Sequence, residues 1–183
     1  EVMKLLFLGD VVGRTGRTAI SETLPKLREA WKLDFVVVKG ETASNGAGLS
    51  GDHAKLLLEA GADCITLGDH AFDQRDMLQF IETEPRILRP MNFAKDAPGR
   101  GAAIFDAGRG RRILVAQVLG QVFMKRPFDD PFSAVDAVLR RTTERPAAVK
   151  GHKINGAQID FERREVRFED GSREELSERE SDR

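Results

Sequence analysis

The sequence predicts an α/β fold built on a parallel sheet. Three apolar runs, beginning at Lys4, Phe35 and Cys64, have the length and composition of buried strands. Stretches with the apolar spacing of helices separate these runs, so we expect the strands to lie parallel and side by side. The carboxyl ends of such strands meet at one edge of the sheet, where open α/β folds bind their ligands.

The first helix is expected directly after the first strand, behind a loop that contains two glycines. Its apolar residues recur at helical spacing and share one face: Ile20, Leu24, Leu27 and Trp31. Pro25 lies inside this pattern and is expected to kink or divide the helix, because proline cannot donate a backbone hydrogen bond.

The second and third helices have predicted caps at Ser50 and Asp73. Their expected inward-facing residues are Ala54, Leu57 and Leu58 in the second helix and Met77, Phe80 and Ile81 in the third. Residues 87–93 resemble a strand, which Pro90 places at a sheet edge or ends early. Residues 102–105 and 112–119 flank a Gly-Arg-Gly turn and predict a hairpin.

The length of 183 residues predicts one domain over 1–183 with a core of its own. Its expected parts are a main body over 1–141 that includes a helix near 134–139, a terminal hairpin within 142–168 that pairs 157–161 with 166–168, and a disordered tail over 169–183. The tail has mixed charges and one large apolar residue, Leu176, so it lacks a core pattern.

The bulk composition excludes several classes of protein. The net charge of −1 argues against general nucleic-acid binding, which normally needs a basic excess. No apolar run approaches the roughly 20 residues that span a bilayer, so we expect no membrane partner. The chain leads directly from Glu1 into a strand without a signal-like segment, and its single cysteine, Cys64, excludes an intramolecular disulfide. We therefore expect a cytoplasmic protein in which Cys64 is buried filler.

Each of the three apolar runs ends in a glycine followed by an acid. These acids are Asp10, Glu41 and Asp69, and His70 follows Asp69 directly. Carboxylates gathered at one sheet edge repel one another unless a positive charge lies between them, and a divalent metal centre supplies that charge. Two such ions could clamp a phosphate and activate a water, and His70 could donate a proton to the leaving oxygen.

Simpler interpretations of these residues remain open. Asp10 could cap the following helix or pair with Arg14 or Arg17, and His70 could be a surface histidine. The glycines of the first loop do not match a P-loop or a dinucleotide-binding spacing. Of the other histidines, His53 is expected to be solvated on a helix, and His152 remains a weak candidate ligand.

Several segments, in this order, resemble the YmdB-like branch of the calcineurin-like metallophosphoesterases. The resemblance covers about residues 3–141 and is carried by Leu8–Gly13, Gly40–Ala43, Leu67–Asp73, Arg89–Phe93, Gly120–Met124 and Asp129–Phe132. It implies a layered α/β sandwich of the metallophosphoesterase type, often homo-oligomeric, that hydrolyses cyclic nucleotides or similar phosphodiesters. It also implies a cofactor of two divalent metal ions (Mn, Fe or Mg).

The resemblance also assigns site residues. It implies metal binding by Asp10, Glu41 and Asp69, acid catalysis by His70 and a substrate contact by Asn92. Thr42 stands where the family pattern has an asparagine, and Asp69 replaces another asparagine.

The histidine-rich metal motifs of the family's second half are absent, as if an internal segment were missing. A site limited to carboxylates and water suits Mg or Mn and binds weakly. We therefore expect either a metal-dependent phosphodiesterase or a catalytically silent relative that acts in binding or regulation. The missing half is also expected to leave one sheet face uncovered, which oligomerisation could cover.

Overall fold

The structure is a computed structural model that describes residues 2–124, 128–142, 152–154, 157–160, 165–168 and 172–175. The chain forms two compact units, Glu1–Leu139 and Arg140–Arg183. Helix α4 (Pro131–Thr142) runs across the boundary between them. The five residues that the resemblance assigns to the site all belong to the first unit: Asp10, Glu41, Asp69, His70 and Asn92.

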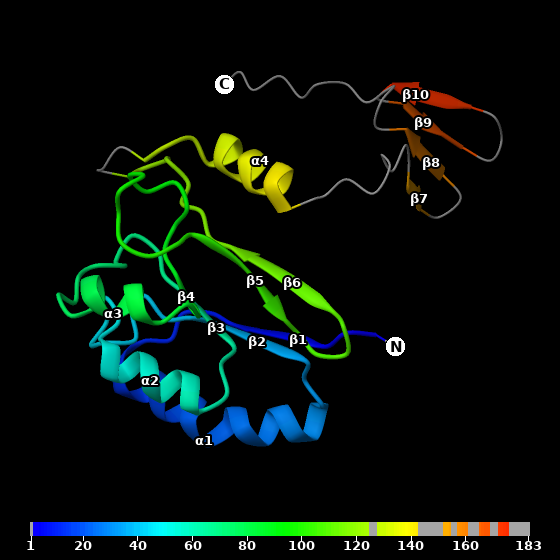
Figure 1. Cartoon of the computed structure of the whole chain (residues 1–183). Coiled ribbons are helices and arrows are strands. Elements are labelled where there is room, and N and C mark those ends of the chain that lie inside the picture. The colour runs from blue at the N-terminus through cyan, green and yellow to red at the C-terminus, as the bar shows by residue number, and fades with distance from the viewer. Residues whose placement is uncertain are drawn as a thin grey trace. The chain divides into compact units, whose positions relative to one another are not determined.

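A four-stranded parallel sheet forms the centre of the first unit (Figure 1). Its strands lie in the order β1 (Leu5–Leu8), β2 (Phe35–Lys39), β3 (Cys64–Thr66) and β4 (Ile87–Leu88). Every neighbouring pair is parallel, which confirms the predicted sheet. The short edge strand β4 ends just before Arg89 and Pro90, as the proline predicts.

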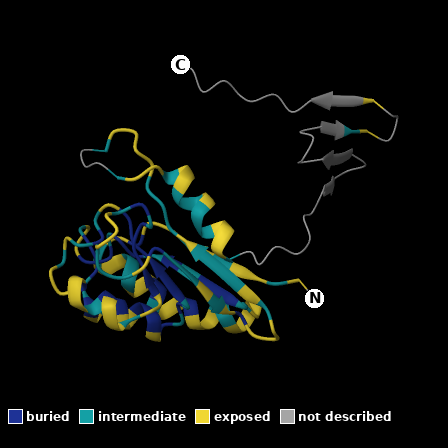
Figure 2. Ribbon diagram, turned by 45° about the horizontal axis from the view of Figure 1, so that its top comes forward, coloured by how far each residue is buried: buried dark blue, intermediate teal, exposed yellow. Residues whose placement is uncertain are grey.

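Three helices, α1 (Gly13–Trp31), α2 (Gly51–Glu59) and α3 (Met77–Thr83), pack on one face of this sheet. Alternate strand residues point toward them, so Val36, Val38 and Ile65 are fully buried. Figure 2 shows this burial pattern, with buried strands at the centre and exposed residues on the outer sides of the helices.

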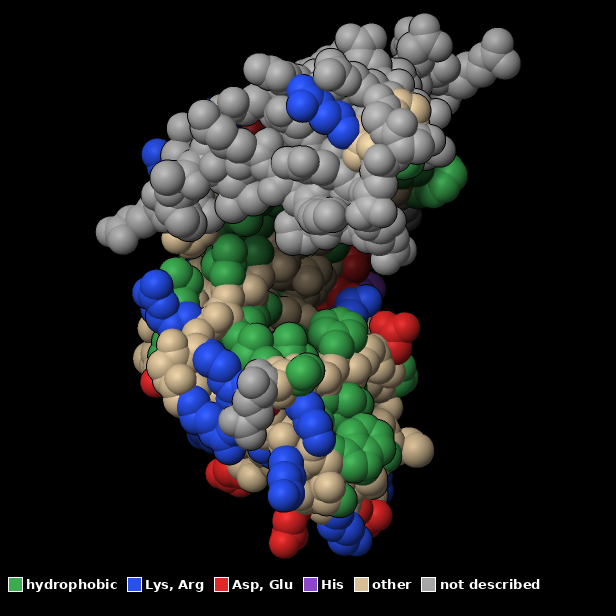
Figure 3. All heavy atoms as spheres, turned by 90° about the vertical axis from the view of Figure 1, so that its right-hand side faces the viewer, with side chains coloured by type: hydrophobic (Ala, Val, Ile, Leu, Met, Phe, Trp, Pro, Cys, Tyr) green, Lys and Arg blue, Asp and Glu red, His purple; other side chains and the backbone are tan. Residues whose placement is uncertain are grey.

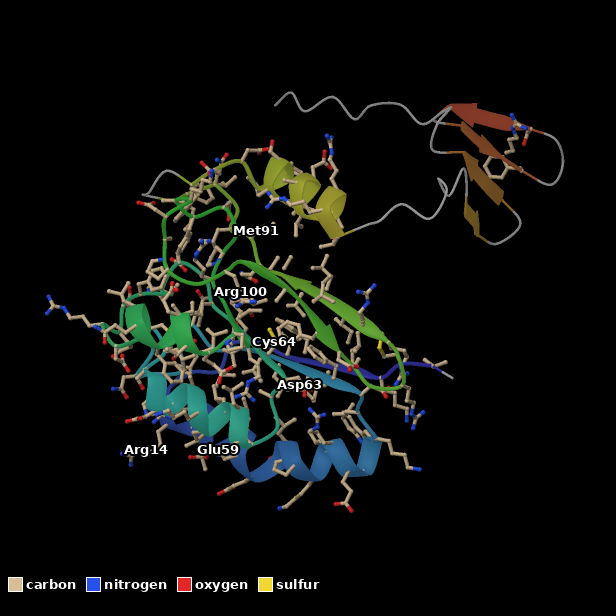
Figure 4. All side chains as sticks on the ribbon, viewed as in Figure 1. Arg14, Glu59, Asp63, Cys64, Met91 and Arg100 are labelled. Carbon is tan, nitrogen blue, oxygen red and sulfur yellow. The ribbon has the colours of Figure 1, made fainter. Side chains whose placement is uncertain are left out.

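The opposite face of the sheet is covered by an antiparallel hairpin of β5 (Ala102–Asp106) and β6 (Arg112–Ala116). Phe35 and Cys64 face this hairpin and pack against it. Cys64 is labelled between the sheet and the hairpin in Figure 4. Burial raises the pKa of its thiol to about 12, so it is an unreactive core residue, as predicted.

The first helix differs from its prediction in two ways. Helix α1 is not divided at Pro25, which lies on the exposed side while Ile20 and Leu24 hold the helix to the core. Trp31, expected on the buried face, is 52% exposed because it is the last residue of the helix.

The second unit contains an antiparallel sheet in the order β10-β9-β8-β7. Its strands are β7 (His152–Ile154), β8 (Ala157–Asp160), β9 (Glu165–Arg167) and β10 (Arg173–Glu175). The pairing of β8 with β9 is the predicted terminal hairpin. Strand β10 lies in the stretch that the sequence analysis expects to be disordered. It forms by backbone hydrogen bonding to β9, and such pairing does not require an apolar pattern. The rest of that tail, 169–171 and 176–183, lies outside the described residues.

Some apolar surface of the first unit stays exposed. Leu5 and Phe7 of the edge strand β1 are 56% and 62% exposed. They are register neighbours of Phe35 and Val37, so they lie on the hairpin side of the sheet but beyond the hairpin's cover. Figure 3 shows apolar side chains exposed among basic ones on one face of the molecule. Within the described residues, no helix is long and apolar enough to cross a membrane.

Candidate phosphoester site

The candidate site lies where β1, β2 and β3 end. Asp10 follows β1 with a left-handed backbone, φ 51°, which aspartate tolerates better than most residues. Its side chain is 84% exposed, and Oδ1 accepts a hydrogen bond of 3.3 Å from Nζ of Lys39. Asp10 therefore neither caps α1, whose N-cap is Val12, nor pairs with the arginines of the first turns.

Those arginines have other surroundings. Arg17 donates to the carbonyl oxygen of Ala43, and Arg14 projects outward from α1 (Figure 4). The loops after β1 and β2 are also joined directly, because Gly13 N donates to Thr42 O at 3.1 Å and Thr42 Oγ1 donates to Val11 O at 3.0 Å. Thr42, which departs from the family pattern, thus holds the two loops together.

Glu41 follows β2 and is only 8% exposed. Its Oε1 lies 2.8 Å from Nζ of Lys39, whereas Oε2 is buried and has no hydrogen-bond partner among the described residues. The carboxylate lies flat against Gly68 at the end of β3, where a Cβ atom would be 1.8 Å from Oε2. The glycine before Asp69 is therefore required by the close approach of Glu41.

Lys39, the last residue of β2, contacts both carboxylates. The distances from its Nζ are 2.8 Å to Glu41 Oε1 and 3.3 Å to Asp10 Oδ1. The hydrogen bond to Glu41 raises the pKa of Lys39 and outweighs the opposing effect of burial. The sequence analysis did not single out Lys39 as a site residue. The alternation of side chains along β2 nevertheless places Lys39 on the opposite face of the strand from the buried Val38.

Asp69 and His70 follow β3. The ring of His70 is held by Asp73, whose Oδ2 accepts a hydrogen bond of 2.6 Å from Nδ1. This bond raises the pKa of His70 most, and the nearby charges of Asp69, Asp73 and Glu41 raise it further. The other ring nitrogen, Nε2, lies 3.8 Å from Asp69 Oδ2. His70 is therefore an oriented imidazole at the same sheet edge, and its pKa is raised above the usual value for histidine.

Asp73 was predicted to cap the third helix, and that prediction is wrong. Helix α3 begins at Met77, with Asp76 at its N-cap. Five residues thus separate His70 from the helix cap instead of the expected two, and the carboxylate of Asp73 turns back to bind His70. The pair could be found in sequence only by asking which acid within a turn of the histidine can reach its ring.

The predicted metal ligands do not form a complete coordination shell. Asp10 and Glu41 converge on one positive charge, and Gly68 brings the chain of Asp69 beside Glu41. However, within the described ranges no three carboxylate, imidazole or thiolate groups lie close enough together to hold a metal ion. The arrangement fits a cation at the Asp10 and Glu41 carboxylates, because the unpartnered Oε2 still has lone pairs to donate.

Asn92, assigned to a substrate contact, is fully buried. Its Nδ2 donates to Leu119 O at 2.8 Å and to Asp129 O at 3.0 Å, and its Oδ1 accepts from Leu119 N at 2.9 Å. The amide therefore holds two later segments against the end of β4 and presents no surface to a substrate. Nearby, Gly101 permits another close approach, since a Cβ there would be 2.2 Å from the backbone of Met91, labelled in Figure 4.

His53 is also different from its prediction. It is half-buried on α2, and its Nδ1 lies 2.6 Å from Ser44 Oγ, in the loop that follows Glu41. Burial lowers the pKa of His53, and the positive charge of Arg17 lowers it further. The cap at Ser50 is confirmed, because Ser50 Oγ accepts a hydrogen bond from His53 N at 3.3 Å. The side chain of His152 is outside the described part of the chain.

Comparisons with known proteins agree with this architecture. A family model described as YmdB-like protein matches residues 6–155. A 2',3'-cyclic-nucleotide 2'-phosphodiesterase of Bacillus subtilis is 37% identical over 143 residues, which are 78% of this chain and 53% of that protein. The chain spans about half the length of the curated relatives that it matches.

Two solved structures share the fold. A hypothetical protein from Thermus thermophilus superposes with a TM-score of 0.72 at 38% identity, over 77% of this chain and 54% of that one. A phosphatase from Mycoplasma pneumoniae superposes with a TM-score of 0.71 at 30% identity, over 78% of this chain and 52% of that one. The layered α/β fold predicted from the sequence is therefore confirmed.

Proposed function

The chain belongs to the YmdB-like family, and on that basis we propose that it is a metal-dependent phosphoesterase that hydrolyses phosphodiesters. The observation that carries this proposal is the convergence of Asp10 and Glu41 on a cation position beside the His70–Asp73 pair. The name of the Bacillus subtilis relative supports cyclic nucleotides as the substrate class.

In this proposal, Asp10 and Glu41 hold the divalent metal, and Asp69 joins them only by moving closer, because no three such groups among the described residues lie within reach of one ion. Carboxylate oxygens suit Mn²⁺ or Mg²⁺ better than they suit Zn²⁺. When bound, such ions neutralise phosphate oxygens and lower the pKa of water, so that a nucleophile forms near neutral pH. The buried Oε2 of Glu41 has no hydrogen-bond partner among the described residues, whereas Oε1 already contacts Lys39.

His70 donates the proton that the leaving oxygen needs. The hydrogen bond from Nδ1 to Asp73 fixes the ring orientation and leaves Nε2 as the proton donor. The bond also favours the charged imidazolium, which must be present before the ester bond breaks. Asn92 is proposed to act indirectly, by holding the segments around Leu119 and Asp129 in place, because its own amide is buried.

The substitution His70→Ala tests the proposed acid. General acid catalysis contributes about 10²–10⁴-fold, so the variant is expected to lose activity by that order on 2',3'-cyclic AMP, whose leaving alkoxide needs a proton. The loss should be far smaller on bis-p-nitrophenyl phosphate, whose nitrophenolate leaves without protonation. Asp52→Asn, a change to an exposed acid of α2, serves as the control and should behave like wild type on both esters.

A second substitution separates the metal ligands from the acid. Asp10→Asn is expected to lose Mn²⁺ and activity together on both esters, whereas His70→Ala should keep wild-type metal content. Equal losses of the His70 variant on both esters would remove the acid role. Absence of any Mn²⁺-dependent turnover by wild type would reject the enzyme and favour the alternative below.

The alternative is a catalytically silent relative that acts in binding or regulation. One observation favours it: Lys39 already places a positive charge beside both Asp10 and Glu41, so the buried Glu41 has a charged partner without a metal ion. Metal analysis and the ester assays above distinguish the two functions.

A homo-oligomer is part of the main proposal. The exposed Leu5 and Phe7 on β1 are the apolar residues that a second copy would cover. Sedimentation velocity of the wild type and of a Leu5→Lys, Phe7→Lys double variant tests this assembly. A wild type that sediments as a monomer would contradict it.

A further inference from the structure

The ammonium of Lys39 lies where a metal ion would contact Asp10 and Glu41. Its Nζ is 2.8 Å from one carboxylate and 3.3 Å from the other. These carboxylates come from the ends of two neighbouring strands, and Lys39 is itself the last residue of β2. The cation is thus supplied by the rigid sheet rather than by a mobile loop.

The buried carboxylate of Glu41 needs a positive charge close to it, whereas the exposed carboxylate of Asp10 does not. Glu41 is 8% exposed, and a buried carboxylate without a nearby positive charge is strongly disfavoured. A lysine ammonium provides one compact charge with three donors on a flexible stem. It satisfies Glu41 Oε1 and Asp10 Oδ1 but leaves Glu41 Oε2 without a partner among the described residues.

We propose that Lys39 is a tethered cation that competes with the divalent metal for Asp10 and Glu41. A metal ion enters this position only after the ammonium of Lys39 has left it. The apparent metal affinity is therefore reduced by the fraction of molecules in which Lys39 is displaced. The inference rests on the proposed function only in its assignment of Asp10 and Glu41 to the metal.

The buried oxygen of Glu41 gives the incoming ion its advantage. Oε2 has no hydrogen-bond partner among the described residues and keeps lone pairs that Lys39 does not use, and a divalent ion would carry twice the charge of the ammonium. The ion pair of Lys39 thus sets a threshold of metal concentration without abolishing the site. Such a threshold makes this protein responsive to metal supply.

Removal of the ammonium tests the proposal. Mn²⁺ binding by isothermal titration calorimetry and melting temperature in EDTA and in Mn²⁺ are measured for wild type and for Lys39→Met. The variant is expected to bind Mn²⁺ about tenfold more tightly or better, which corresponds to displacement of Lys39 in one molecule in ten or fewer. Its melting temperature should fall in EDTA, where Glu41 lacks a counter-charge, and recover with Mn²⁺.

The control is Lys55→Met, which removes an exposed lysine of α2 whose Nζ lies 3.8 Å from Asp52. This variant should match wild type in Mn²⁺ affinity. Adding Asp10→Asn to Lys39→Met should abolish the gain, because the ion then loses one of its carboxylates. Lys39→Gln, which keeps an amide donor without the charge, replaces the methionine variant if the latter does not fold.

Unchanged Mn²⁺ affinity on removal of the Lys39 charge would overturn the proposal, and so would a failure of both wild type and variant to bind Mn²⁺. Failure of the enzymatic function looks different. Tighter Mn²⁺ binding without ester hydrolysis would keep the tethered cation and reject the phosphoesterase. Ester hydrolysis by wild type, together with a Mn²⁺ affinity that does not change when the Lys39 charge is removed, would keep the phosphoesterase and reject the tethered cation.

Discussion

Replacement of Gly68 by alanine is the sharpest test of the site geometry. Gly68 lies at the end of β3, and the carboxylate of Glu41 packs directly on it. An alanine Cβ would lie 1.8 Å from Oε2, 2.5 Å from Cδ and 2.7 Å from Oε1 of Glu41. All three distances are shorter than any stable contact, so the whole carboxylate must move away from Gly68.

The size of the effect follows from this displacement. Non-bonded contacts to Cβ atoms almost never fall below 3.0 Å, so Oε2 must retreat by about 1 Å or more. A misplacement of about 1 Å at a reacting site costs about 10²-fold in rate. The overpacking itself costs about 1–3 kcal/mol of stability, which lowers the melting temperature by roughly 2–12 °C in a chain of this size.

The assays are Mn²⁺ titration, melting temperature and hydrolysis of bis-p-nitrophenyl phosphate. Gly51→Ala is the matched control, because Gly51 is also buried but its Cβ would meet the ring of Phe80 at 3.1 Å. Both variants should lose some stability, and Gly68→Ala alone should lose Mn²⁺ affinity and activity. If Gly68→Ala kept wild-type metal affinity and turnover, the position of Glu41 would be irrelevant to the site.

Three further outcomes are expected. Asn92→Ala should lower the free energy of unfolding by about 3 kcal/mol, because it removes three buried hydrogen bonds. Gln79→Ala, on the exposed side of α3, is the control and should change stability little. Thermal melts that show equal effects for the two variants would contradict this. Since the folded pKa of His53 is lowered, its stabilising contribution is complete above pH 6.5 and is lost as the pH falls through the folded value. In urea denaturation, the free energy of unfolding of His53→Gln should therefore fall less at acid pH than that of wild type. The same pH dependence in both proteins would exclude this contribution of His53. Asp73→Asn should impair hydrolysis of 2',3'-cyclic AMP more than that of the nitrophenyl ester, as His70→Ala does, and the same loss on both esters would count against its orienting role.

The parallel sheet was predictable because burial dictates residue type along β2 and β3. Val36, Val38 and Ile65 face the helices, while Phe35 and Cys64 face the hairpin, so both faces require apolar residues. The spacing between these runs then leaves room for one helix each. The order of the strands follows from the same parallel connections.

The convergence of Asp10 and Glu41 was also predictable, because it depends on strand direction alone. The contacts that surround them were not. The reach of Lys39 across to both acids depends on its rotamer, and the pairing of Asp73 with His70 depends on where α3 begins. Such details arise from tertiary packing, which a single sequence pattern does not encode.

Pro25 illustrates a further limit. The local rule predicts a break, but a proline on the exposed side removes one hydrogen bond while Ile20 and Leu24 keep the helix anchored in the core. His53 shows the same effect for a polar residue. Its pairing with Ser44 requires the loop after β2 to fold back on α2, which the chain achieves through glycines at positions with positive φ, Gly46 and Gly48.

The central claim is that the carboxyl ends of β1 and β2 form a cation-binding phosphoester site. The most direct measurement is anomalous diffraction at the Mn absorption edge from crystals of the full chain soaked in saturating Mn²⁺. The account predicts an anomalous peak bound to Asp10 and to Glu41 Oε2, with the ammonium of Lys39 displaced from both carboxylates. A peak elsewhere in the molecule, or Lys39 still seated between Asp10 and Glu41 with no peak at this edge, would contradict it.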